Sequence, residues 1–141
     1  MADAAHKRSV SFRFEPTLVR RLKQRAKLMG AGQTALAERY LDEGMRQDDH
    51  PLIYFREGAS GRRAALLGTR LDVADAITTV RQNGGSATEA ADYLEMPVER
   101  IEAAARYYGE YKDEIDAEIE TAQETAERER ELGIKGREAL V

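Results

Sequence analysis

The chain has no cysteine and no tryptophan, and only two histidines occur among its 141 residues. The absence of cysteine excludes disulfides and thiolate zinc sites, and it leaves His6 and His50 as the soft metal ligands. Without a cysteine nucleophile, or a histidine beside a plausible nucleophile, we expect no catalytic site, no bound metal and no cofactor. The sequence therefore predicts a protein that acts by binding and not as an enzyme.

Long apolar runs are also missing from the sequence. No stretch approaches the roughly 20 apolar residues that a membrane helix requires, and residues 1–10 lack the apolar core of a secretory signal. Aromatic residues make up 6% of the chain and charged residues 34%, so only small hydrophobic cores can form. We expect a cytoplasmic protein without membrane contact, whose small cores are supported by dimerisation or by a partner protein.

Charge is distributed unevenly along the chain, although the net charge is only -4. Residues 1–30 hold eight Lys or Arg against two Asp or Glu, a balance of +6. Residues 31–109 hold nine against thirteen, and residues 110–141 hold five against eleven, so their balances are -4 and -6. A basic head is attracted to phosphate, whereas an acidic tail suits a basic protein surface. This distribution indicates two partners, a nucleic acid and a protein.

The basic head begins with an alternating segment at residues 9–14. In an extended chain its apolar and polar side chains lie on opposite faces: Val10, Phe12 and Phe14 on one, and Ser9, Ser11 and Arg13 on the other. Such alternation is typical of a half-buried strand, although a solvated sheet edge shows the same pattern.

Two helices are expected after this strand. Pro16 suits the first position of a helix, and apolar residues recur at helical spacing from Leu18 to Met29. Gly30 is expected to end that helix, and a second apolar stripe begins at Leu36. One strand and two short helices bury too little apolar surface to stand alone, so this order predicts a homodimer.

The order strand, helix, helix over roughly residues 8–47 resembles the ribbon-helix-helix (CopG/Arc-like) family of repressors. The resemblance implies a dimer in which one short strand from each chain pairs into a ribbon that enters the major groove of operator DNA. It implies DNA contact by Ser9, Ser11, Arg13, Gln33 and Thr34, and a dimer core made by Val10, Phe12, Phe14, Leu36 and Tyr40. Arg13 is the leading specificity residue, because arginine pairs well with guanine.

A new unit is expected after His50-Pro51, because proline disfavours helix in the residue before it. We interpret residues 48–65 as a linker with a short strand or hairpin, and residues 66–109 as a small helical domain. Helices are expected to begin at Asp72, Ser86 and Pro97. Only a short turn separates the last two helices, which is typical of helix-turn-helix geometry.

The stretch from Leu66 to Tyr108, with Gly68-Thr69-Arg70 near its start, resembles the helix-turn-helix-like domain of VapB-type antitoxins. The resemblance implies a type II toxin-antitoxin system whose toxin, a PIN-domain-like ribonuclease, is a separate protein. Because Glu99 and Glu102 lie on the would-be recognition helix and oppose phosphate, we assign DNA contact to the basic head. The helix-turn-helix-like unit is then expected to serve packing or a protein interface.

Residues 110–141 form the acidic tail, and the helical pattern is expected to run without a break from Tyr107 to Leu132. The residues expected to bind the toxin lie on a narrow apolar stripe: Tyr108, Tyr111, Ile115 and Ile119. Such a helix is marginal alone but can lay its stripe into a groove of a partner. A solvated terminal helix or a homotypic coiled coil would show the same pattern.

Together with these features, the two resemblances imply an antitoxin that binds its toxin directly and represses its own operon as a dimer or higher oligomer. The expected fold is mainly α: a flexible N-terminus at residues 1–7, a ribbon-helix-helix, a small helix-turn-helix-like domain and a long C-terminal helix. The alternative is a stand-alone ribbon-helix-helix regulator with a helical sensing and oligomerisation domain. A third class, an adaptor that does not touch DNA, would show no salt-dependent binding to its promoter.

Overall fold

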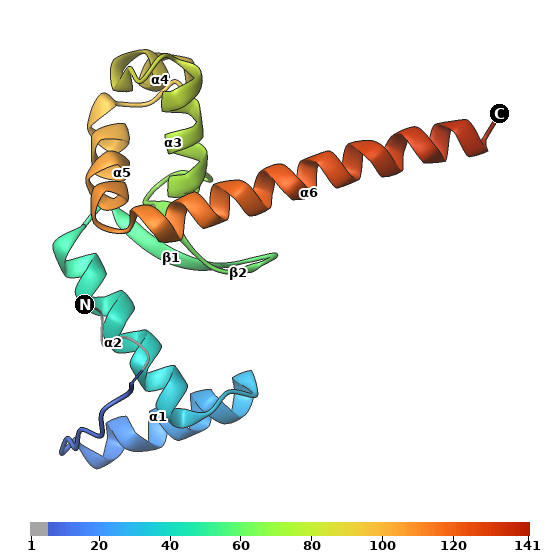
Figure 1. Cartoon of the computed structure of the whole chain (residues 1–141). Helices are drawn as coiled ribbons and strands as arrows, with labels where there is room; N and C mark the ends of the chain where they lie inside the picture. The colour runs from blue at the N-terminus through green and yellow to red at the C-terminus, as the bar shows by residue number, and fades with distance from the viewer. Residues whose placement is uncertain (1–5) are drawn as a thin grey trace. The chain divides into compact units, whose positions relative to one another are not determined.

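The computed structural model describes residues 6–141, which form six helices and one two-stranded sheet. The chain divides into two compact units, residues 1–42 (unit 1) and residues 43–141 (unit 2). The elements are α1 Pro16–Met29, α2 Gln33–Asp49, β1 Ile53–Gly58, β2 Gly61–Leu66, α3 Val73–Gln82, α4 Ala87–Tyr93, α5 Val98–Glu110 and α6 Lys112–Ala139 (Figure 1). The predicted mainly helical chain with a long C-terminal helix is confirmed. Of the predicted flexible N-terminus, residues 1–5 lie outside the described residues.

Unit 1 consists of an extended segment, α1 and the first part of α2. Pro16 lies in the first turn of α1, where its missing N–H costs no hydrogen bond. Gly30 follows the last residue of the helix with a φ of 63°, a conformation that glycine adopts without the steric penalty of a Cβ atom. The N–H of Ala31 then donates to the carbonyl oxygen of Ala26 at 2.9 Å and closes the helix end. Both predicted ends of α1 are confirmed.

Residues 6–15 are extended but form no strand, so the strand predicted at residues 9–14 is absent from the single chain. A strand is defined by the hydrogen bonds it exchanges with a neighbour. Among the described residues, β1 pairs with β2 and Ala65 bridges to Asp72, and none of these pairings involves residues 6–15. The strand was predicted to pair with a second copy of the chain, so its pairing within a dimer stays a prediction.

Unit 2 opens with the end of α2 and a hairpin. β1 and β2 pair antiparallel, with Ile53 opposite Leu66 at the open end and Gly58 opposite Gly61 at the turn. Ile53 and Leu66 are both buried in the hydrophobic core of unit 2. The hairpin expected within residues 48–65 is confirmed, but its interpretation as part of a linker is wrong, because helices cover its apolar face.

The boundary between the two units also differs from the prediction. It falls after Asp42, inside α2, and not at His50-Pro51. The last turns of α2 belong to unit 2 because Arg46 donates a hydrogen bond to the Tyr107 hydroxyl and His50 packs against the same ring. Proline ends the helix locally, but the limits of a folded unit depend on packing.

Three helices build most of the remaining core of unit 2, and their predicted starts are confirmed. Asp72 precedes α3, and its backbone N–H donates to Asp75 Oδ2 at 3.0 Å. The Ser86 hydroxyl accepts a hydrogen bond from the backbone N–H of Glu89 at 3.1 Å, and Pro97 immediately precedes α5. These caps involve residues three positions apart, so the local sequence is enough to place them. The largest fully buried side chains are Tyr107, Ile53, Leu66, Ile101, Ile115 and Val73.

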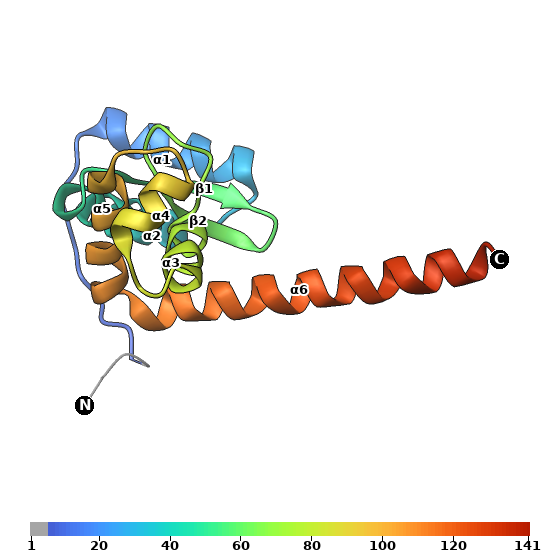
Figure 2. The same ribbon diagram turned by 90° about the horizontal axis from the view of Figure 1, so that it is seen from above.

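The long C-terminal helix does not continue α5. The helix is interrupted at Tyr111, whose backbone is not helical, with φ of -120° and ψ of 42°. The predicted uninterrupted helix from Tyr107 is therefore wrong. Ile115 and Ile119 then anchor the start of α6 on the core of unit 2, whereas every residue from 120 to 141 is exposed. Figures 1 and 2 both show the second half of α6 extending away from the rest of unit 2. α6 therefore has a packed beginning and a free end.

Candidate nucleic-acid interface and partner surfaces

The residues predicted to contact DNA all lie on the surface of unit 1. Ser9, Ser11 and Arg13 belong to the extended segment, and Gln33 and Thr34 are the first two residues of α2. All five are exposed. The first backbone N–H groups of a helix have no partner inside the helix, and the first turn of α2 contains no acidic residue. This helix start has the free donors and partial positive charge that suit an anion.

The other face of the extended segment is apolar and exposed. Val10, Phe12 and Phe14 are 67%, 62% and 48% exposed. The rings of Phe12 and Phe14 stack on each other, with centroids 5.7 Å apart and planes inclined by 18°. Large apolar side chains gathered on a surface indicate a site that a partner covers.

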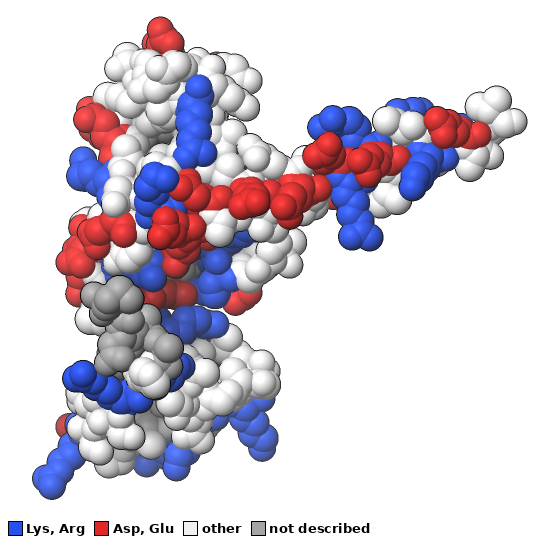
Figure 3. Space-filling model, in the orientation of Figure 1, with Lys and Arg blue, Asp and Glu red and all other residues white. Residues whose placement is uncertain are grey.

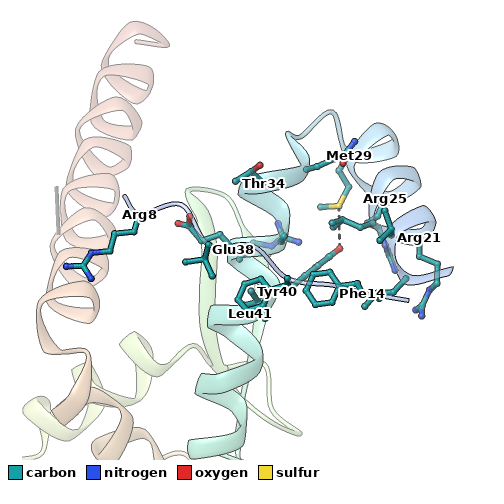
Figure 4. A pocket seen from close by; sticks show the side chains of 17 residues that line it. Arg8, Phe14, Arg21, Arg25, Met29, Thr34, Glu38, Tyr40 and Leu41 are labelled. Atoms are coloured by element: carbon teal, nitrogen blue, oxygen red, sulfur yellow. Dashed lines mark hydrogen bonds between the residues drawn. The ribbon is translucent and has the colours of Figure 1, made fainter. Parts of the chain in front are cut away.

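The extended segment, α1 and α2 border an open apolar groove of about 940 Å³ within unit 1 (Figure 4). Four residues of the predicted dimer core line it: Val10, Phe12, Phe14 and Tyr40. In Figure 4 the Tyr40 hydroxyl points toward the Met29 sulfur, 4.0 Å away. The fifth residue, Leu36, is buried in unit 1 itself. Most of the predicted dimer core is therefore unburied in the single chain.

Basic side chains project from unit 1 on the face drawn in Figure 3. α1 carries no acidic residue and five basic ones: Arg20, Arg21, Lys23, Arg25 and Lys27. Arg21 and Arg25 line the groove, where Figure 4 labels them. Unit 1 therefore combines an uncovered apolar face with positive charge.

Four acidic residues at the start of the tail are paired inside unit 2. Four contacts join them to basic side chains: Arg46–Glu114 at 2.9 Å, His50–Glu110 at 3.0 Å, Arg63–Glu118 at 3.7 Å and Arg81–Asp116 at 2.9 Å. Figure 3 shows acidic side chains along the first part of α6. Hydrogen bonds from Lys112, Tyr108 and Arg81 hold the pKa of the Asp116 carboxyl well below its usual range. Four of the eleven acidic residues of the tail are thus paired within unit 2, three of them with arginines, so part of the negative charge that predicted a basic partner is met within the chain.

The stripe predicted to bind the toxin is part of the same packing. Ile115 and Ile119 are 0% and 6% exposed. Tyr108 and Tyr111 are half-buried against the core, and the Tyr108 hydroxyl donates to Asp116 Oδ1 at 2.7 Å. The fold of unit 2 therefore buries Ile115 and Ile119 away from a toxin, whereas toxin binding by the half-buried Tyr108 and Tyr111 stays a prediction. Helical spacing shows that they share a face, but it does not show what covers that face.

Arg46 makes contacts in this region that the sequence did not reveal. Its Nη1 donates to the Tyr107 hydroxyl at 2.8 Å and to Glu114 Oε2 at 2.9 Å. Burial alone would lower the pKa of the Arg46 guanidinium, but the hydrogen bonds to Glu114 and Tyr107 raise it above its ordinary value. The partners lie more than sixty residues away along the chain, so no local pattern connects them.

Glu118 is a carboxylate with little hydrogen-bond compensation. Its Oε2 atom is buried and accepts no hydrogen bond, while Arg63 Nη1 lies 3.7 Å away. Burial raises the pKa of Glu118 to about 7, although the charge of Arg63 acts in the opposite direction. Glu118 therefore changes its charge near neutral pH.

The α4–α5 pair, predicted to have helix-turn-helix geometry, presents an acidic surface. Its exposed acids are Glu89, Asp92, Glu95, Glu99 and Glu102. Fixed negative charge repels phosphate, so these residues favour DNA contact through unit 1 and not through α5. Tyr93, 73% exposed, adds an aromatic ring to the same pair of helices.

Two further properties concern the described range, residues 6–141. No group of three or more His, Asp or Glu side chains there is arranged to hold a metal ion. None of its helices combines the length and the apolar character that crossing a bilayer requires.

Comparisons of the chain with protein-family models, with curated proteins and with solved structures found no match.

Proposed function

We propose that this chain is the antitoxin of a type II toxin-antitoxin system and that it represses its own operon as a ribbon-helix-helix dimer. One observation carries the proposal: Val10, Phe12 and Phe14 stand exposed on an extended segment beside an open apolar groove. Exposed apolar area is unfavourable in water, at roughly 25 cal/mol for each Å². A second copy of the chain would cover the segment and the groove together.

In the proposed dimer, residues 9–14 of two chains pair as an antiparallel ribbon. The pairing satisfies backbone N–H and C=O groups that the single chain leaves without a strand partner. Because side chains alternate along a strand, covering the apolar face turns Ser9, Ser11 and Arg13 to the opposite side. A ribbon of two strands fits the major groove, where Arg13 would donate two hydrogen bonds to a guanine.

The start of α2 supplies the proposed contact to the DNA backbone. The N–H groups of its first turn, which includes Gln33 and Thr34, would donate to a phosphate, and the Thr34 hydroxyl can add another donor. Contacts of this kind fix the register of the protein on the duplex without reading its sequence. Base readout then depends on the ribbon alone.

For the toxin we propose the free end of α6, residues 120–141, as the contact. Every residue of this stretch is exposed, and a helix without a packed face is marginal in water. Leu132, Ile134 and Leu140 offer apolar side chains that are 56%, 41% and 89% exposed. A groove on the toxin would cover them and stabilise the helix. A PIN-domain-like ribonuclease is the toxin that the sequence resemblance implies.

A stand-alone regulator is the second candidate. It is favoured by the internal pairing of Glu110, Glu114, Asp116 and Glu118, since a self-contained protein needs no partner to neutralise these acids. In that case the free end of α6 would join copies of this chain. The two candidates share the DNA-binding head and differ in whether a toxin exists.

Light scattering and footprinting on the purified full chain test the DNA-binding part. We expect the molar mass of a dimer, and protection of a site with two-fold sequence symmetry in the region upstream of its gene. A monomer, or a chain with no salt-dependent binding to that region, would overturn the proposal.

Co-expression with the product of the neighbouring gene separates the two candidates. We expect that product to arrest growth alone and to be harmless together with this chain. A neighbour without toxicity, or toxicity that this chain does not relieve, would favour the stand-alone regulator.

A further inference from the structure

Five arginines of unit 2 are matched by acidic side chains. Their ion pairs run from Arg46 to Glu114, Arg56 to Asp72, Arg62 to Glu43, Arg63 to Glu118 and Arg81 to Asp116. In three of these pairs the charged atoms are 2.9 Å apart or closer and the acidic side chain is at least partly buried: Arg56–Asp72, Arg62–Glu43 and Arg81–Asp116. The positive charges of these arginines therefore take part in ion pairs within unit 2.

The basic residues of α1 differ from these arginines. None of the five makes an ion pair with an acidic side chain among residues 6–141, and the one polar contact is from Arg20 Nη2 to the Thr17 hydroxyl at 3.5 Å. α1 itself contains no acid that could compensate them. Five positive charges therefore stand uncompensated on a helix of 14 residues.

Helical spacing sorts these charges into two groups. Arg21 and Arg25 line the apolar groove. Arg20, Lys23 and Lys27 follow the spacing i, i+3, i+7, which places them on one stripe of the helix. All three are exposed, and none lines the groove. We call Arg20, Lys23 and Lys27 the α1 stripe.

Like charges at this spacing repel each other and destabilise a helix unless an anion lies against them. From Arg20 to Lys27 the helix rises about 10 Å, and a DNA duplex presents about six phosphate charges along the same length. A partner bound in the groove would leave the α1 stripe uncovered, because the residues of the stripe do not line the groove. Charge, length and exposure all fit a duplex backbone.

We infer that the α1 stripe binds phosphates of duplex DNA without regard to base sequence. This inference rests on the proposed function in one respect, namely that unit 1 binds DNA. It adds a third contact surface, which provides general affinity for duplex and is separate from the base contact of Arg13 and from the phosphate contact at the start of α2. Loss of the stripe should weaken binding to every sequence equally.

The test replaces the stripe in the full chain, as Arg20→Gln, Lys23→Gln and Lys27→Gln together. Two probes are titrated at several salt concentrations between about 50 and 200 mM: the region upstream of the gene, and a duplex of the same length with scrambled sequence. We expect the slope of log affinity against log salt to fall by about 3 per chain for both probes, and the preference between them to stay unchanged. Affinity at low salt should drop roughly tenfold or more.

A matched control replaces three exposed basic residues of α6 in the same way, as Arg128→Gln, Lys135→Gln and Arg137→Gln. This variant should keep the wild-type slope. Circular dichroism melting establishes that both variants are folded. If the triple α1 variant does not fold, the three single substitutions replace it, each with an expected loss of about 1 in the slope.

An unchanged slope in the α1 variant overturns the inference. So does a variant that binds both duplexes normally but no longer binds a protein partner, because the stripe would then serve an acidic protein. Failure of the proposed function looks different: the wild type would bind both probes equally. If the slope of log affinity against log salt still falls in the α1 variant in that case, the inference about the stripe holds, although the chain is not a sequence-specific repressor.

Discussion

The guanidinium of Arg46 lies over the ring of Tyr111, with its Cζ atom 3.9 Å from the ring centroid. The same group donates hydrogen bonds to the Tyr107 hydroxyl and to Glu114. Arg46 stands near the end of α2, whereas Tyr111 marks the break between α5 and α6. The Arg46 side chain therefore connects α2, α5 and α6 at the point where the tail begins.

Replacing Arg46 should loosen this junction. We expect Arg46→Met to lower the free energy of unfolding of unit 2 by about 2 kcal/mol, because the cation–π contact and two hydrogen bonds are lost and the buried Tyr107 hydroxyl loses a donor. Urea unfolding followed by circular dichroism measures the change. Arg106→Met, at an exposed position of α5, is the control and should stay within about 0.5 kcal/mol of wild type. Equal effects of the two substitutions would contradict the assignment.

Glu118 should make the stability of unit 2 depend on pH. Its pKa is about 7 in the folded chain against an ordinary value of 4.5, so the folded state binds more protons between these values. The stabilising contribution is complete below about pH 4.5 and is lost as the pH rises to about 7. Glu118→Gln should therefore gain stability relative to wild type across this window, by roughly 1 to 3 kcal/mol in urea unfolding. A difference between the two proteins that does not change with pH would exclude this role.

The turn between α4 and α5 contains a strained residue. Glu95 has a φ of 54°, which is unfavourable for a residue with a Cβ atom and natural for glycine. We expect Glu95→Gly to raise the thermal stability of the chain, by about 0.5 kcal/mol. The same substitution inside a helix, Glu102→Gly on α5, should cost about 1 kcal/mol. Two changes of the same sign in calorimetry would show that strain at Glu95 is unimportant.

Truncation separates the packed part of α6 from its free end. A chain that ends after Thr121 keeps Ile115 and Ile119 and should melt as cooperatively as the full chain. A chain that lacks residues 110–141 loses both core residues and should not fold unit 2, because two buried apolar side chains are removed. Both truncations should fail to neutralise the toxin. Rescue of growth by the chain that ends after Thr121 would show that the free end is not the contact.

Arg13 should govern sequence preference and nothing else. We expect Arg13→Ala to reduce the preference for the upstream region over scrambled duplex by about 1 to 3 kcal/mol, the usual worth of a bidentate contact to guanine. Toxin neutralisation should survive, because unit 2 and α6 are unchanged. Gel-shift competition and the growth assay measure the two properties in parallel. Equal loss of both would point to a folding defect and remove the support for base contact.

The ends of the helices could be predicted because their causes lie within a few residues. Pro16 fits a first turn, Gly30 supplies a left-handed residue, and Ser86 offers its oxygen to an N–H three residues ahead. The sequence also indicated that Val10, Phe12 and Phe14 share an apolar face, and these side chains are in fact uncovered in the single chain. Such features depend on backbone geometry and spacing alone.

What covers an apolar or charged face was decided only by the tertiary structure. Periodicity placed Ile115 and Ile119 on one stripe, but only the fold showed that unit 2 buries them and leaves residues 120–141 free. The acidic charge at the start of the tail is likewise met by Arg46 and Arg81, which lie far away along the chain. A sequence records which residues share a face, whereas the neighbour of that face is set by packing between distant segments, and this carries no local signal.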